Sequence, residues 1–165
     1  MLDTIDSNQT WEQLKLETIN IKVDLSIMSH DAVSEHPFVN ISLNGFPQFG
    51  EICDKDTVVE FDAEIEDDTE NFLTIEYNNK NAKQDVVLGE DGGPVADKRV
   101  EIKSISFDDI ELDFFQLADP DTFKYEPIDP EGINATGFYA TKLSWNGKTT
   151  LRFTTPIYIW LLENL

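Results

Sequence analysis

The sequence predicts an all-β fold, specifically an antiparallel β-sandwich of the jelly-roll type. Two observations support this prediction. Apolar and polar residues alternate with a period of two in several short runs, and turn-forming residues separate these runs at short intervals. A chain of 165 residues can bury a substantial core, so one domain is expected over residues 1–165. Within it we expect a core module at 15–115, a long connection at 116–135, and a carboxy-terminal hairpin with an apolar closing segment at 136–165.

The first elements begin after a lead-in or edge element at residues 1–14, which contains Trp11. The cleanest strand signal covers residues 19–27, where five aliphatic side chains alternate with polar ones. The pattern predicts a strand with one face in the core.

A hairpin is expected next. Residues 39–43 alternate and run into Asn44-Gly45, a strong two-residue hairpin signal. The returning strand covers 46–52, and Pro47 assigns it to a sheet edge because proline cannot donate a backbone hydrogen bond.

Four further strands are predicted before residue 115, at 59–65, 72–77, 100–107 and 110–114. Apolar parity changes within 100–107, which predicts a β-bulge near Lys103 and Ser104. Asp108-Asp109 is read as a tight turn.

The last third of the chain has a different character. Prolines and a glycine at 116–135 are expected to break any regular element there. Two strands at 138–145 and 148–155 then flank the Asn146-Gly147 turn. The apolar segment 156–165 is expected to pack onto the sandwich or onto a neighbouring subunit.

Charge restricts the choice of partners. The chain has 33 acidic and 12 basic residues, a net charge of −21, which repels nucleic acid and anionic membrane surfaces. No apolar run is long enough to cross a bilayer, and no signal peptide is recognised. The protein is therefore expected to fold in a cytoplasm without inserting into a membrane.

Catalytic residue types are scarce. The only histidines, His30 and His36, share one loop, and the single cysteine, Cys53, lies among acidic residues that raise a thiol pKa. Neither a zinc pattern nor a phosphate-binding fingerprint occurs. The protein is expected not to be an enzyme.

The polar loop at 78–99 is the strongest candidate site. It is long for a compact domain, and it combines tight glycines with the oxygen ligands that calcium prefers. The predicted metal ligands are Asn79, Asp85, Glu90, Asp91 and Asp97. The alternative is a mobile acidic loop that binds no metal.

These segments resemble a known family. The strand ending at Asn44-Gly45, the strand ending at Asn78-Asn79, and the strand that follows Asp97-Lys98-Arg99 are similar to the calcium-dependent, xylan-binding type of carbohydrate-binding module. The resemblance covers residues 18–113, and implies a β-sandwich in which a loop-held calcium contacts sugar hydroxyls. The family pattern has Asp where this chain has Asn79.

A second resemblance concerns the end of the chain. The segments 144–147 and 156–163 resemble small structural proteins of tailed marine phages. This resemblance implies that the chain is a virion protein of a bacteriophage. Its partners would then be neighbouring virion subunits, including further copies of this chain.

Two functions follow as expectations. The first is a non-catalytic, calcium-dependent carbohydrate-binding protein, acting as a virion component that contacts host glycans. The alternative is a purely structural virion or assembly protein without sugar binding. The sugar contacts are unknown, and the aromatic residues in or beside loops are Phe46, Phe49, Phe123, Tyr125 and Tyr139.

Overall fold

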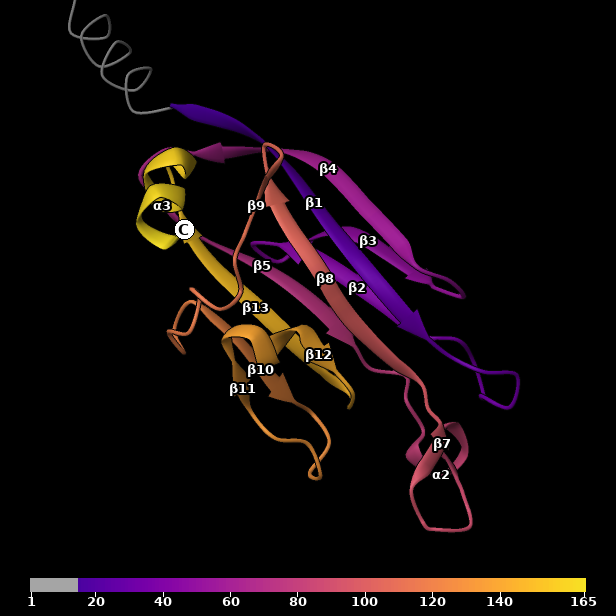
Figure 1. Ribbon diagram of the computed structural model, residues 1–165. Helices are drawn as coiled ribbons and strands as arrows, with labels where there is room; N and C mark the ends of the chain where they lie inside the picture. Colours follow the sequence, from indigo (N-terminus) through magenta and orange to yellow (C-terminus); the bar gives the residue numbers. More distant parts are fainter. Residues whose placement is uncertain (1–14) are drawn as a thin grey trace, which may run out of the picture.

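The computed structural model describes residues 15–165, and Figure 1 shows strands throughout, with a short helix at one end. The strands form two large antiparallel sheets and a small hairpin, so the predicted all-β fold is confirmed. The expected lead-in at 1–14, with Trp11, lies outside the described residues. None of the helices in the described part of the chain has the length and apolar character needed to cross a membrane.

The first sheet, sheet A, has the order β12–β8–β1–β4, with β9 paired to β8. Its strands are β1 (Leu16–Met28), β4 (Thr57–Glu66), β8 (Arg99–Phe107), β9 (Ile110–Glu111) and β12 (Lys142–Leu143). The register between β1 and β8 shifts at Asp24/Leu25, where Lys103 is the extra residue. The predicted β-bulge is therefore present.

The second sheet, sheet B, has the order β11–β10–β13–β5–β2–β3. Its strands are β2 (Phe38–Leu43), β3 (Phe46–Ile52), β5 (Glu70–Tyr77), β10 (Phe123–Pro127), β11 (Ala135–Thr136) and β13 (Gly147–Thr154). β3, which contains Pro47, is the edge strand that the sequence predicted. Asn44 and Gly45 both have positive φ, which suits the tight β2–β3 hairpin.

One hydrophobic core joins the two sheets. Alternate side chains of the central strands are fully buried, including those of Ile21 in β1 and Ile75 in β5. Phe107 of β8 contacts Phe153 of β13, with 4.8 Å between ring centroids. The inward faces of the sheets therefore pack on each other, and their outward faces meet solvent.

The chain ends in α3 (Ile157–Asn164), a helix that the sequence analysis did not predict. Ile157, Trp160 and Leu161 are buried, and the Trp160 ring lies 6.0 Å from Phe107 and 6.2 Å from Phe153. The Ile157 amide donates to the Glu17 carboxylate at the start of β1. The closing segment thus packs onto the core through one face only.

Three sequence expectations for residues 110–145 were wrong. Residues 116–135 are not an irregular connection throughout, because they contain β10, which pairs with β13 inside sheet B. The strand expected at 138–145 is a 3₁₀ helix, η1 (Gly137–Thr141), followed by the two-residue β12. The strand expected at 110–114 ends at Glu111. Prolines bound β10 without interrupting it, and the tertiary contacts of Phe123 and Tyr125 with the core hold it in place.

Candidate functional site

The loop at 78–99 is structured. It contains α2 (Ala82–Asp85) and a hairpin of β6 (Val87–Leu88) and β7 (Pro94–Ala96). Figure 1 shows α2 and β7 beyond the end of β8, away from the two large sheets. An isolated two-stranded hairpin is marginally stable, so the contacts at its base hold it in place.

Lys98 is the centre of these contacts. Its side chain and that of Asp85 are both 0% exposed, and the Lys98 Nζ lies 3.4 Å from the Asp85 Oδ2. The same Nζ donates to the Asn79 carbonyl oxygen at 2.7 Å. A cation carried by the chain itself therefore joins two of the predicted metal ligands.

The Asp85 carboxylate is fully engaged. Its Oδ1 accepts from the Ser34 amide and hydroxyl, and its Oδ2 accepts from the Asn81 amide as well as facing Lys98. Burial alone would raise the pKa of Asp85, but these hydrogen bonds and the Lys98 ammonium outweigh it and lower the pKa. Asp85 is accordingly held as a charged group inside the protein.

A second lysine holds Asp97. The nearly buried Lys80 Nζ lies 2.8 Å from the Asp97 Oδ1 and donates to the Ser144 carbonyl oxygen at 2.6 Å. The Lys98 amide donates to the same Asp97 oxygen. Asn146 fixes Lys80 through a pair of hydrogen bonds between its side-chain amide and the Lys80 backbone.

The remaining predicted ligands lie apart from this cluster. Glu90 and Asp91 are exposed in the turn between β6 and β7, where the Asp91 Oδ1 accepts from the Gly93 amide. The Asn79 side chain bonds the Phe38 amide and the His36 carbonyl. Only Asn79, Asp85 and Asp97 are brought near one another, through Lys80 and Lys98.

This arrangement does not fit the predicted calcium ion. Calcium needs six to eight oxygen ligands, whereas the Asp85 carboxylate already accepts four donors, about as many as it has lone-pair sites. Over residues 15–165 no group of three or more histidine, cysteine or acidic side chains is placed to hold a metal. Every buried side-chain nitrogen and oxygen in that part of the chain has a hydrogen-bond partner.

The aromatic candidates separate into two classes. Phe123 and Tyr125 belong to the core, and Phe49 is partly buried against it. Phe46 is 71% exposed and Tyr139 is 70% exposed. Only the last two have rings open to a ligand.

Tyr139 belongs to an exposed group that the sequence analysis missed. Phe115, 71% exposed, stacks on Phe138 with 4.7 Å between centroids and 5° between planes. The Tyr139 ring meets Phe138 edge to face at 5.7 Å. We name Phe115, Phe138 and Tyr139 the aromatic surface.

A hollow of about 340 Å³ lies beside the aromatic surface. Phe115 and Phe138 line it together with charged side chains of Lys103, Glu111 and Asp113. It is shallow and open, and it combines aromatic rings with polar groups able to donate or accept hydrogen bonds.

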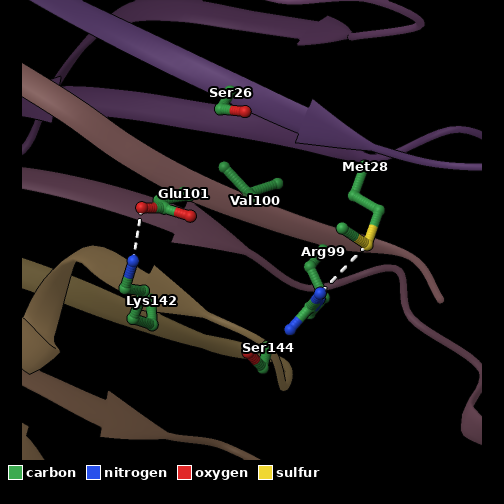
Figure 2. A pocket seen from close by; sticks show the side chains of 7 residues that line it. All are labelled: Ser26, Met28, Arg99, Val100, Glu101, Lys142 and Ser144. Carbon is green, nitrogen blue, oxygen red and sulfur yellow. Dashed lines mark hydrogen bonds and ion pairs between the residues drawn. The ribbon is translucent and has the colours of Figure 1, made fainter. Parts of the chain in front are cut away.

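A separate, smaller cleft lies on the outer face of sheet A, as Figure 2 shows. Lys142 connects the two, because its Nζ lies 4.9 Å from the Phe138 ring centroid and also pairs with Glu101 in the cleft. Lys142 therefore contacts both the aromatic surface and the polar groups of the cleft.

The cysteine and histidines are structural in this arrangement. Burial raises the pKa of the Cys53 thiol, with smaller contributions from the charges of Glu51 and Asp54. The ring nitrogens of His30 contact the Asp85 carbonyl and the Ala32 amide, and His36 Nδ1 contacts the Ser29 hydroxyl.

Comparison of the chain with protein-family profiles, with curated proteins and with solved structures found no match. The site must therefore be interpreted from its own chemistry.

Proposed function

We propose that this protein is a non-catalytic carbohydrate-binding protein whose ligand stacks on the aromatic surface. The observation that carries the proposal is the exposure of Phe115, which lines a hollow of mixed aromatic and charged residues, and of Tyr139, whose ring meets that of Phe138. A large apolar ring gains little by pointing into water, so clustered exposed rings mark interaction sites.

Sugar chemistry matches this surface. A pyranose ring has apolar C–H faces and hydroxyls around its rim, so one face can lie on an aromatic ring while the hydroxyls bond polar side chains. The Phe115 ring is covered on one face by Phe138, which fixes its orientation. Lys103 and Glu111 lie in the same hollow, where they can donate to and accept from hydroxyl groups.

We propose that binding does not use calcium in the 78–99 loop. Lys98 and Lys80 already neutralise Asp85 and Asp97, and a divalent cation beside them would meet an ammonium group. The family resemblance implies calcium-dependent binding, and this stays a prediction. The binding assay described next, run once with added calcium and once with chelator, tests it.

The test is affinity electrophoresis and calorimetry against a panel of soluble polysaccharides that includes xylan. Phe115→Ala should weaken binding by about two- to twelvefold, because a stacked ring contributes about 0.5–1.5 kcal/mol. The matched control is Phe46→Ala, since Phe46 is equally exposed but lies on the β2–β3 hairpin. Equal loss in both variants, or no binding to any polymer by the native protein, contradicts the proposal.

A second candidate is a structural virion or assembly protein, favoured by the outer face of α3. Tyr158, Ile159 and Leu162 are more than half exposed on this helix, Leu162 at 81%. Such a face is suited to a neighbouring subunit. Sedimentation of the native protein and of Leu162→Asp tests this candidate: assembly that the substitution abolishes supports it, and a monomer at all concentrations contradicts self-assembly.

The two candidates are compatible. Many copies on one particle would convert weak sugar binding at single sites into useful avidity for host glycans. Variants at Phe115 and Leu162 separate sugar binding from assembly, since Phe115 lies only in the aromatic surface and Leu162 lies only on the outer face of α3.

A further inference from the structure

The cleft in Figure 2 collects positive and hydroxyl groups on the outer face of sheet A. Arg99 of β8 and Lys142 of β12 line it, with the side chains of Ser26 and Ser144. Glu101 is the one carboxylate among its lining residues. This composition differs from that of the strongly acidic chain as a whole, which has a net charge of −21.

The Arg99 guanidinium has donors to spare. Its Nε lies 3.5 Å from the Asp97 Oδ2, and one terminal nitrogen donates to the Met28 sulfur at 3.1 Å. A thioether is a weak acceptor, so the forked end of Arg99 keeps donors for a stronger acceptor. Figure 2 shows this end between Met28 and Ser144.

The size of the cleft suits a functional group rather than a whole sugar. Its volume is about 60 Å³. That is several times the roughly 10–15 Å³ needed by one water, and far below the roughly 300 Å³ of the smallest ligand pockets. A carboxylate or a sulfate is of this order, and both match the planar donors of arginine.

We infer that this cleft binds a carboxylate or sulfate group carried by a sugar chain that stacks on the aromatic surface. The sugar part of this inference rests on the proposed function, whereas anion binding by Arg99 and Lys142 stands on the cleft alone. Lys142 links the cleft to the aromatic surface, because it lines the cleft and its ammonium also lies over the Phe138 ring.

The net charge does not oppose this assignment at physiological salt. Charges farther away than about 8 Å are largely screened, so the nearest groups decide the local potential. The nearest acidic groups are Glu101, paired with Lys142, and Asp97, whose other oxygen is held by Lys80. An incoming anion would compete with Glu101 for Lys142 and take the open donors of Arg99.

The test uses the full chain labelled with ¹⁵N and three small probes, namely glucuronate, sulfate and neutral xylose. We expect the Arg99 side-chain N–H resonance to shift with glucuronate, with sulfate or with both. Arg99→Gln should abolish the shifts of neighbouring amides, and Lys142→Met should reduce them. The control Lys22→Gln, in which a paired lysine of β1 is replaced, should leave them unchanged.

Each outcome is decisive. A shift with only one anion shows whether the cleft binds a carboxylate or a sulfate. A shift with both shows that the cleft recognises the negatively charged oxygens that the two groups share. If neither anion moves the Arg99 resonance, or if Lys22→Gln removes the response as well, the inference is overturned.

Polymers then separate this inference from the proposed function. Arg99→Gln should cost about ten- to a hundredfold in affinity for an acidic polysaccharide and little for its neutral counterpart, because a charge-assisted hydrogen bond contributes about 1.5–3 kcal/mol. Phe115→Ala should weaken both. If Arg99→Gln loses the preference for the acidic polymer and Phe115→Ala keeps it, the anion-binding cleft is supported. If Phe115→Ala binds both polymers as tightly as the native protein, the stacking site is contradicted but the cleft is not.

Discussion

Replacing Lys98 with methionine tests whether the lysine is the internal cation of the 78–99 loop. Methionine keeps an unbranched side chain of similar length but has no charge. The substitution leaves the Asp85 carboxylate buried without its ammonium partner and the Asn79 carbonyl without its donor. It should therefore destabilise the protein and release the hairpin base.

The size of the effect follows from burial. Both side chains are 0% exposed, so solvent does not screen the pair. Removing one partner of a buried ion pair costs about 3–5 kcal/mol, because the other charge is left uncompensated. For a domain of this size each kcal/mol lowers the Tm by about 2–4 °C, so we expect a decrease of roughly 6–20 °C.

Thermal unfolding followed by circular dichroism measures this decrease. Lys55→Met is the control, since Lys55 is exposed in the turn between β3 and β4. The double variant Lys98→Met/Asp85→Asn should recover part of the loss, because it removes the uncompensated charge and keeps an acceptor for Ser34.

Calcium supplies the decisive comparison. Native protein should show the same Tm in chelator and in millimolar calcium, whereas Lys98→Met can gain stability from an added cation that replaces the ammonium. A Tm of native protein that rises by several degrees with calcium, or a Lys98→Met variant as stable as Lys55→Met, would refute the reasoning.

Three further predictions concern stability. Because the pKa of Asp85 is lowered in the folded state, its contribution to the stability of the fold is complete above about pH 4 and is lost as pH falls through the folded-state pKa. Asp85→Asn should therefore flatten the acid side of a curve of Tm against pH. Burial, aided by the Asp129 charge, raises the pKa of Tyr125 to about 12, so the free energy of unfolding should decrease as pH rises above about 10. This decrease should be less steep in Tyr125→Phe, which is measured by following tyrosinate absorbance and unfolding together. Trp160→Ala should cost about 3–5 kcal/mol in urea unfolding, whereas Ile159→Ala, on the exposed face of the same helix, should cost little.

The parts of the fold that the sequence predicted depend on local patterns. β1 alternates from Ile19 to Leu25, and in this part of the strand the apolar residues are the buried ones. Asn44-Gly45 forms the expected turn because both residues adopt positive φ. β10 and α3 were missed because short segments near prolines acquire their structure from neighbours, here β13 and the Phe107–Phe153 pair.

The candidate site shows the same division. Lys98 has the parity of Val100 and Ile102, both buried, so the alternation of β8 extended by one step would have placed this lysine toward the core. Its partner Asp85 has no such signal, because only the return of the chain through α2 brings it there. Phe114 and Phe115 are neighbours in the sequence, yet Phe114 stacks on buried Phe123, whereas exposed Phe115 stacks on the partly buried ring of Phe138.

By itself the sequence determined the all-β class, most of the strands and the position of the long polar loop. These features follow from alternation and turn chemistry, which act between residues close together in the chain. The tertiary structure alone decided that lysines occupy the loop where a metal was expected, and that Phe115, Phe138 and Tyr139 form one exposed surface. Both depend on contacts between segments far apart in sequence, whose pairing is fixed only when the two sheets close on their common core.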